Sequence, residues 1–218
     1  MSKIILINIG KTSLVEGSLN WVTNGSEMFW NTPGLTSFNV NLPSLTNGSN
    51  MFSFCTNLTS FSTDLPSLTN GYMMFQGCKS LVSWNIDLPS LTDGRSMFSS
   101  CDNFTSFTGD LSSLTNAQQM FTSCKNLTSF NSDLSSLTDA GSGYNSMFGS
   151  ATYNCTKLDL ASVQNIAETI NDLASQGKTG TLSIGMAMSL QSDDETTPVN
   201  VALAAIRAKG WTVTELYV

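Results

Sequence analysis

Apolar and polar positions alternate along this chain in a block that recurs at a constant interval. Within residues 35–57 the block reads LTSFNVNLPSLTNGSNMFSFCTN. Its most visible members recur in register as Met28-Phe29, Met51-Phe52, Met74-Phe75, Met97-Phe98 and Met120-Phe121. A fixed period of about 23 residues is typical of a solenoid, in which each coil buries its apolar side chains only against its neighbours.

The apolar side chains of the block form ladders, since most of them have an equivalent one repeat further along the chain. Within residues 35–57 the members of these ladders are Leu35, Phe38, Leu42, Leu45, Met51, Phe52 and Cys55. Together they supply a row of inward-facing side chains in every coil, which is enough for a continuous core.

Each coil is predicted to contain one short strand and a tight turn. The segment Leu-x-x-Phe is too short for a helix and predicts a strand, and directly paired strands lie roughly 4.8 Å apart. The step Asn47-Gly48 predicts the turn, because both residue types tolerate positive φ. Pro43 and its equivalents Pro66 and Pro89 are expected to fix the corner before it.

Residues 159–218 lack the repeat and carry mixed helix and strand patterns. Apolar residues at helical spacing predict a helix over 162–174, and the alternation of Thr181–Ile184 predicts a strand. Thr197 and Pro198 mark the start of a second helix, which is expected to end at Gly210. Residues 211–218 alternate as a closing strand. Solenoids need a terminal cap over their last coil, and we expect this small α/β segment to provide it.

The chain is therefore divided into three parts: an N-terminal capping strand over 1–11, a solenoid over 12–158 and the α/β cap over 159–218. Lys3–Ile9 is the predicted capping strand. The following Gly10-Lys11-Thr12 resembles part of a phosphate-binding loop, but Ile5 stands where that loop needs a glycine. We therefore interpret these residues as the passage from the capping strand into the first coil.

The spacing changes once, in an insertion within residues 139–155. Met147 comes four residues later than the spacing of the earlier Met-Phe pairs predicts. The loop 140–144, rich in Gly, Ser and Tyr, is expected to bulge from one edge of the stack. It is either a contact loop or an adaptor between the solenoid and its cap, and the sequence leaves both interpretations open.

Composition narrows the function classes. The net charge is −7 with only 11% charged residues, which argues against nucleic-acid binding because that needs a basic surface. No apolar run is long enough to span a membrane, and the N-terminus carries no convincing signal peptide. The chain has no histidine, and no acid–base or nucleophile set converges in it. We therefore expect neither enzymatic activity nor a cofactor.

Most of the cysteines sit once per coil at an inward position, at Cys55, Cys78, Cys101 and Cys124. No C-x-x-C pair indicates a zinc site, and side chains that run parallel in stacked coils have the wrong geometry for disulfides. We expect buried free thiols that act as small apolar side chains.

A further ladder is acidic and consists of Asp64, Asp87, Asp110 and Asp133. A row of Ca²⁺ sites is one interpretation, because carboxylate oxygens suit this cation. The interpretation we favour is that each Asp accepts hydrogen bonds from backbone amides at a corner. The number of ligands per coil is low for calcium, so we expect no metal site.

Positions that differ between coils form the candidate recognition surface, because the core does not dictate them. Aromatic residues exposed on a rigid scaffold suit protein or glycan binding. Single exposed apolar residues are also ordinary features of a surface. The candidates are Trp30, Phe54, Tyr72, Arg95, Gln118, Gln119 and, in the insertion, Tyr144.

Over roughly residues 12–158 the repeat resembles the leucine-rich repeats of bacterial surface proteins of the BspA-like class. The counterpart of their motif reads Leu58-Thr59-Ser60-Phe61, Pro66-Ser67-Leu68, Asn70-Gly71, Met74-Phe75 and Cys78. The chain departs from that motif by Phe or Trp at the usual Ile, Asn or Asp before the Gly, and Met before the Phe. The resemblance implies a right-handed, curved leucine-rich-repeat solenoid used for binding, with no catalytic residues.

We interpret the chain as a non-enzymatic scaffold that presents variable side chains to a partner. The absence of an export signal, the low charge and the ending Gly210-Trp211-Thr212-Val213 favour a bacteriophage virion component, such as a head decoration, a fibre or a tail-associated protein. That ending resembles the ends of repeat proteins from bacteriophage and gut-bacterial genomes.

The partners expected are other virion proteins or a host-surface protein or glycan. The alternative is a bacterial cell-surface or secreted adhesin with leucine-rich repeats. The end strands 3–9 and 211–218 are also expected to allow homo-oligomers by strand pairing.

Overall fold

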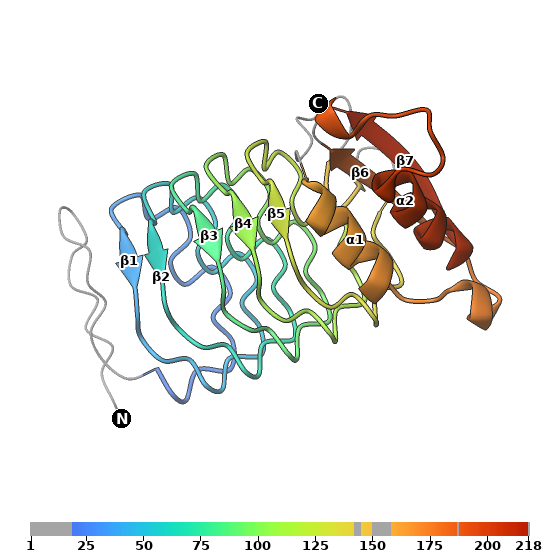
Figure 1. The fold of residues 1–218 in the computed structure, drawn as a ribbon. Coiled ribbons are helices and arrows are strands. Elements are labelled where there is room, and N and C mark those ends of the chain that lie inside the picture. Colours follow the sequence, from blue (N-terminus) through green and yellow to red (C-terminus); the bar gives the residue numbers. More distant parts are fainter. Residues whose placement is uncertain (1–18, 142–144, 150–157, 187, 218) are drawn as a thin grey trace.

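The computed structural model describes residues 19–141, 145–149, 158–186 and 188–217. Over this part the chain winds through a row of similar coils, and a segment with two α-helices follows at the C-terminal end of the row (Figure 1). The predicted strand over 3–9, the residues 10–12, the start of the solenoid at residue 12, Tyr144 and Cys155 lie outside the described residues.

Short parallel strands repeat along one side of the row. They are β1 (Ser37–Phe38), β2 (Ser60–Phe61), β3 (Ser83–Trp84), β4 (Ser106–Phe107) and β5 (Ser129–Phe130). Paired residues are equivalents from successive repeats, as in Ser106 opposite Ser129. The strand predicted from Leu-x-x-Phe is therefore confirmed. The ladder is interrupted once. β1 pairs with β2, β3 with β4 and β4 with β5, whereas β2 and β3 do not pair.

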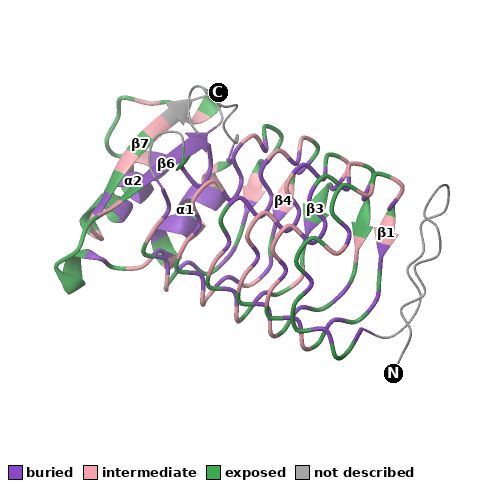
Figure 2. Cartoon of the chain, turned by 180° about the vertical axis from the view of Figure 1, so that it is seen from behind, coloured by how far each residue is buried: buried purple, intermediate pink, exposed green. Residues whose placement is uncertain are grey.

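Two columns of aromatic rings fill the interior of the coils. One column consists of Phe29, Phe52, Phe75, Phe98, Phe121 and Phe148, with neighbouring ring centroids 5.2–5.8 Å apart. The other lies behind the strands and meets the first nearly edge-on, as Phe38 does against Phe52 at 4.8 Å. Such pairs contribute about 0.5–1.5 kcal/mol each beyond the area they bury. Figure 2 shows the alternation of buried and exposed positions that this packing produces along each coil.

A second parallel ladder runs through the Asn-Gly and Asp-Gly steps. Bridges join Asn24, Asn47, Asn70, Asp93, Asn116 and Asp139 in turn. Each of these side chains accepts a hydrogen bond from the amide two residues further on, as Asn47 Oδ1 does from Ser49 N–H at 3.1 Å. Only a short side chain with a carbonyl or carboxylate oxygen makes this local bond, which explains why Asn and Asp alternate here.

The glycine of this step has a different role from the one predicted. Gly48 does not adopt positive φ, which falls instead on later residues of the turn such as Asn50 and Phe54. Glycine leaves space here for a side chain of the next coil, because a Cβ on Gly48 would lie 2.7 Å from Met74 Sδ. In the last coil before the insertion the equivalent residue is Ala117. The turn is where the sequence places it, but the reason given for its glycine is wrong.

The C-terminal segment contains both helices and a small parallel sheet. Its elements are α1 (Leu160–Thr169), η2 (Ala174–Gln176), β6 (Gly180–Met186), η3 (Met188–Leu190), α2 (Pro198–Ala208) and β7 (Trp211–Tyr217). β6 and β7 pair in parallel, and α2 forms the connection between them.

Both helices differ at their ends from the sequence-based expectation. Asp159 caps α1 by accepting from Ser162 N–H at 2.8 Å, so the helix begins before residue 162. It ends at Thr169 rather than residue 174, because the amide of Asn171 donates to the carbonyl of Leu134 in the last coil. Thr197 precedes α2 as predicted, but its hydroxyl donates to the carbonyl of Asp194 instead of capping the helix.

α1 lies against β5 and takes the place of a further strand. The amide of Phe130 donates to Ser162 Oγ at 2.8 Å, and the amide of Ser132 donates to Asn165 Oδ1 at 3.0 Å. Lys209 Nζ then donates to the carbonyls of Ala167 and Glu168 at the end of α1. Side chains of α1 thus accept hydrogen bonds from backbone N–H groups of the last coil, which has no further coil of the described chain beside it to accept them.

The insertion shifts the coil-to-coil ladder by four residues. The amide of Ala117 donates to the carbonyl of Asp139, which precedes the inserted loop, whereas the amide of Gln119 donates to the carbonyl of Asn145, which follows it. Around the inserted loop, Gly141 accepts from Thr181 Oγ1 at 3.0 Å, and Ser146 Oγ donates to Ser183 at 3.2 Å. These contacts with β6 favour the adaptor interpretation of the loop.

The four described cysteines are buried free thiols, as predicted. Each Sγ donates to a phenylalanine carbonyl of the preceding coil, as Cys78 does to Phe52 at 3.2 Å. Burial raises the pKa of Cys55 from 9.0 to about 11 and that of Cys124 to about 12. It also raises the pKa of Cys78 and Cys101 well above 9.0, so the thiols stay protonated in the folded chain.

We expect Gly48→Ala to lower the free energy of unfolding by about 1–3 kcal/mol, because the added Cβ overpacks a closed contact between coils. Gly94→Ala is the matched milder change, since its Cβ would lie 3.0 Å from Leu114 Cδ1 and 3.2 Å from Met120 Sδ. Urea unfolding of both variants measures the difference. Equal losses would contradict the assignment of the glycine to the methionine contact.

The raised thiol pKa values predict a loss of stability in alkali. In the unfolded chain these thiols ionise near 9.0, whereas in the folded chain they hold their protons up to about 11 to 12. Their contribution to stability is therefore full below pH 9 and is lost as the pH rises towards 12.

Unfolding free energies measured across this range should fall less steeply for Cys124→Ala than for the wild type. Alkylation of the native chain, read out by peptide mass spectrometry, should be slow at Cys78 and Cys101 and fast in urea. Equal rates in both solvents would show that the thiols are accessible.

Candidate functional site

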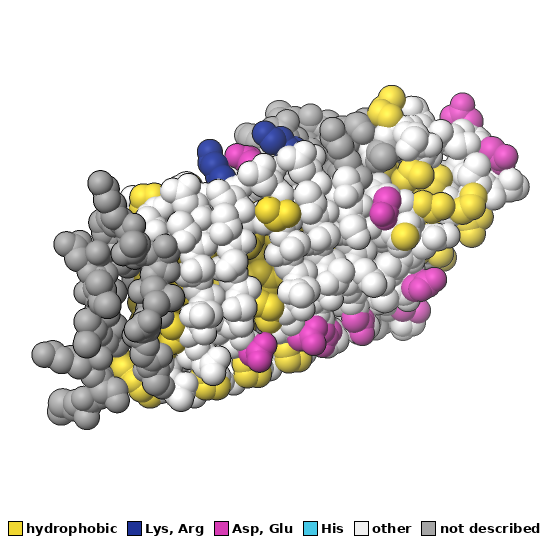
Figure 3. Space-filling model, turned by 60° about the vertical axis from the view of Figure 1, so that its left-hand side comes forward, with side chains coloured by type: hydrophobic (Ala, Val, Ile, Leu, Met, Phe, Trp, Pro, Cys, Tyr) yellow, Lys and Arg dark blue, Asp and Glu magenta, His cyan; other side chains and the backbone are white. Residues whose placement is uncertain are grey.

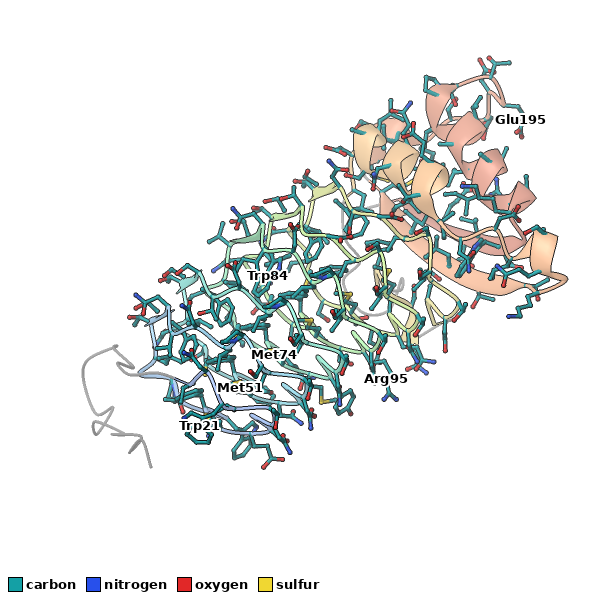
Figure 4. All side chains as sticks on the ribbon, turned by 90° about the horizontal axis from the view of Figure 1, so that it is seen from below. Trp21, Met51, Met74, Trp84, Arg95 and Glu195 are labelled. Carbon is teal, nitrogen blue, oxygen red and sulfur yellow. The ribbon has the colours of Figure 1, made fainter. Side chains whose placement is uncertain are left out.

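The side chains predicted for recognition lie on the surface of the second ladder, which we call the turn face. It covers residues 24–31, 47–54, 70–77, 93–100 and 116–123. Figure 4 shows Arg95 on the opposite side of the stack from Trp84, which belongs to β3. The turn face and the strands therefore occupy opposite sides of the row of coils.

The backbone of the turn face is held coil to coil, independently of its outward side chains. In one coil the amides of Gly71, Met73, Phe75 and Gly77 donate to the carbonyls of Asp93, Arg95, Met97 and Ser99. The other coils before the insertion repeat this pattern. The outward side chains can therefore differ from coil to coil without changing the ladder that carries them.

Tyr72, Arg95 and Gln118 occupy equivalent positions in three successive coils. Arg95 forms a bidentate ion pair with Asp93, with Nε 2.9 Å from Oδ1 and Nη2 2.7 Å from Oδ2. Its Cζ also lies 5.2 Å from the centroid of the Tyr72 ring. Hydrogen bonding to the Asp93 carboxylate raises the pKa of Arg95 further above its ordinary value, so the guanidinium is always charged.

Gln118 and Gln119 are held within the stack more firmly than the sequence suggests. Gln118 Nε2 donates to Asp139 Oδ2 at 2.7 Å, and Gln119 Oε1 accepts from Ser96 Oγ at 3.2 Å. Both side chains are half-buried. They tie neighbouring coils together, and Tyr72 and Arg95 form the polar centre of the turn face.

Trp30 and Phe54 provide its apolar part, with 52% and 42% of their surfaces exposed. Phe54 has positive φ and lies against Gly77 of the next coil, where an added Cβ would come within 2.8 Å of the Phe54 ring. Trp21 is also exposed, at 57%, and was not among the predicted residues. Its signal in the sequence is that the equivalent residue of the following coils is serine, as in Ser44 and Ser67.

The acidic ladder lies at the corner that follows the strands. Asp110 accepts from Ser112 N–H at 2.8 Å and Asp133 from Ser135 N–H at 2.7 Å, which is the local role that we favoured. Asp87 accepts from the amide of Asp110 at 3.0 Å. Across the described part of the chain, no three His, Cys, Asp or Glu side chains come close enough together to hold a metal ion.

The structure adds one feature that the sequence reasoning missed, at the interruption between β2 and β3. A groove opens there, lined by Phe61 and Asp64 from one coil and by Ile86 and Asp87 from the next. Its signal in the sequence is Ile86. The equivalent residue is Thr63 in the previous coil and Gly109 and Ser132 in the following two.

None of the helices in the described segments is long and apolar enough to cross a membrane.

On the turn face, Arg95 and Asp93 are paired with each other, and the buried thiols behind it are protonated. The described arrangement is therefore suited to contact with a partner through aromatic and guanidinium groups.

Comparisons with known proteins agree with the repeat. The model of the BspA type Leucine rich repeat region (6 copies) matches residues 11–92. A second family model, described as Mycoplasma protein of unknown function, DUF285, matches residues 69–179, which are 111 of the 218 residues. Searches among curated proteins and among solved structures found no match. Because the second model covers just over half of the chain, the protein belongs to the family described as Mycoplasma protein of unknown function, DUF285, and it carries BspA-type leucine-rich repeats.

Proposed function

We propose that the protein is a non-enzymatic leucine-rich-repeat solenoid that binds a protein or glycan partner through its turn face. The observation that carries this proposal is the combination of a uniform backbone ladder with outward side chains that vary between coils. A fold that needed those side chains would repeat them as strictly as it repeats its phenylalanines and leucines.

The chemistry of the turn face supports binding. Aromatic residues and Arg are enriched in the centres of protein interfaces. Trp30, Phe54, Tyr72 and Arg95 sit on a backbone that is already fixed, so less ordering entropy is lost when a partner binds. The ion pair with Asp93 and the ring of Tyr72 hold the guanidinium of Arg95 in one place.

We propose further that the protein is a bacteriophage virion component, such as a head decoration, a fibre or a tail-associated protein. The low content of charged residues and the stiff stacked core support a role as a particle component. Its partners are then other virion proteins or a host-surface protein or glycan. Among the described strands β7 pairs with β6 alone, and we propose that its other edge pairs with a second copy.

The alternative is a bacterial cell-surface or secreted adhesin, and the BspA-type repeats support it. The two assignments predict different locations for the same binding surface.

The location decides between them. We expect mass spectrometry of phage particles purified from the source culture to find the protein in constant ratio to the major virion proteins. Recovery from washed bacterial envelopes or from the particle-free medium, and not from particles, would establish the adhesin assignment instead.

Substitutions that copy residues from other coils test whether the turn face binds the partner. Trp30→Ser, Phe54→Ser and Tyr72→Ser each introduce the serine found at the same position in another coil: Ser53, Ser100 and Ser49. We expect the triple variant to keep its melting temperature and to lose about tenfold or more in affinity for the particle or envelope fraction, because exposed aromatic anchors dominate such contacts.

The fraction of labelled protein that sediments with that material, measured over a range of protein concentrations, reports the affinity. Val82→Ser is the matched control, because Val82 is 49% exposed on the strand side. A control variant that weakens binding as much as the triple variant would move the binding surface away from the turn face.

A further inference from the structure

The strand side of the stack contains a groove where its ladder is interrupted. In other coils the amide after each strand reaches back to the preceding coil, as Ser62 N–H does to Phe38 and Asn131 N–H does to Phe107. The equivalent bond from Asn85 N–H to Phe61 is not formed within the described structure. The N–H of Asn85 and the carbonyl of Phe61 therefore lie at the groove without a hydrogen bond between them.

At the interruption, Ile86 lacks a bond between coils that two other coils make at the equivalent position. At the equivalent positions Thr63 Oγ1 donates to Val40 at 2.9 Å and Ser132 Oγ to Gly109 at 2.7 Å, so a hydroxyl joins each of these coils to the one before. Ile86 has no hydroxyl to make this bond. Gly109 has none either, yet β3 and β4 pair, so the missing hydroxyl bond accompanies the interruption without being its whole cause.

The Ile86 segment instead lies close to the following coil. Trp84 Nε1 donates to the Ile86 carbonyl at 2.7 Å, and a Cβ on Gly109 would lie 2.2 Å from that carbonyl oxygen. Glycine at position 109 makes this close approach of the two coils sterically acceptable. The groove on the other side of Ile86 is thus built by Ile86, Trp84 and Gly109 together.

The groove has an apolar floor and an acidic wall. Its volume is about 620 Å³, which lies within the range of ligand sites in proteins. Phe61 is half-buried, whereas Phe38 and Trp84 at the equivalent positions are 2% exposed, so an aromatic edge faces the groove. Figure 3 shows apolar side chains running across this side of the molecule towards a row of acidic side chains along the lower edge.

The acidic wall is not neutralised by the protein itself. No Lys or Arg of the described chain forms an ion pair with Asp64 or Asp87, and the described cations Lys79, Arg95 and Arg207 are paired elsewhere. Asp64 is exposed and makes no hydrogen bond within the described structure. The net charge of −7 adds to the negative potential at the groove.

We propose that this groove binds an extended peptide segment that carries a Lys or Arg side chain. The aliphatic stem of that side chain lies on Phe61 and Ile86, and its cationic head reaches the carboxylates of Asp64 and Asp87. The peptide backbone supplies the donor and the acceptor that Phe61 and Asn85 lack. This proposal goes beyond the proposed function, because it names a second surface and the chemistry of its partner.

The test uses the whole isotope-labelled protein and a short synthetic peptide of alternating valine and lysine, blocked at both ends. We expect the backbone amide signals of residues 61–65 and 83–87 and the indole N–H signal of Trp84 to shift on titration. Affinity should fall as the salt concentration rises, because the carboxylates are exposed. The matching peptide with glutamate in place of lysine should leave these signals unchanged.

Variants separate the parts of the groove. Asp64→Asn with Asp87→Asn should weaken binding of the lysine peptide by about tenfold or more, because two charge-assisted contacts are lost. Asp110→Asn with Asp133→Asn is the matched control from the same acidic ladder outside the groove, and it should stay within about twofold. Ile86→Thr introduces the hydroxyl found at Thr63 in the preceding coil, removes part of the apolar floor and should also weaken binding. Unchanged melting temperatures establish that each variant folds.

Several outcomes would overturn the proposal. They are an absence of shifts, shifts confined to the turn face, equal binding of the glutamate peptide, or displacement of the peptide by calcium chloride that itself produces the same shifts. The last result would make the groove a cation site. Because the turn-face variants are measured separately, failure here leaves the proposed function standing, and failure of the turn-face test leaves this groove to be judged by its own titration.

Discussion

The structure depends on one constraint: the chain must return to the equivalent position after every repeat, because no coil has a core of its own. The two aromatic columns express this directly, with rings stacked from coil to coil and the columns meeting edge to face. In the coils before the insertion, Met51, Met74, Met97 and Met120 each reach into the space left by a glycine of the previous coil. Inward positions are therefore fixed in size as well as in polarity, which explains the strictness of the repeat.

The two sides of the stack use this regularity in different ways. On the turn face the backbone ladder continues through every coil before the insertion, so variation is limited to side chains that the core does not need. On the strand side, the backbone ladder itself is interrupted. Ile86 lacks the hydroxyl bond that Thr63 makes to the preceding coil, and β2 and β3 do not pair there. A repeat protein can therefore acquire a binding surface by decorating a ladder or by interrupting it.

The regular part of the fold could be predicted because each of its signals repeats several times. The short strands, the inward ladders, the buried thiols and the turn at Asn47 follow from patterns that occur in most coils. The ends of α1 and the meaning of Gly48 could not be predicted in the same way. α1 stops where the amide of Asn171 finds the carbonyl of Leu134, and Gly48 makes room for a side chain from another coil. Both depend on partners distant in the sequence.

The sequence by itself determined the period, the identity of the inward ladders and the positions that are free to vary, because stacking makes equivalent residues neighbours. Only the tertiary structure decided which free positions work together. It ties Gln118 and Gln119 into the stack, joins Arg95 to Asp93 and Tyr72, and opens the groove between Phe61 and Ile86. The physical reason is that these outcomes depend on displacements and contacts between coils, and a one-dimensional pattern records the residue types without the distances between them.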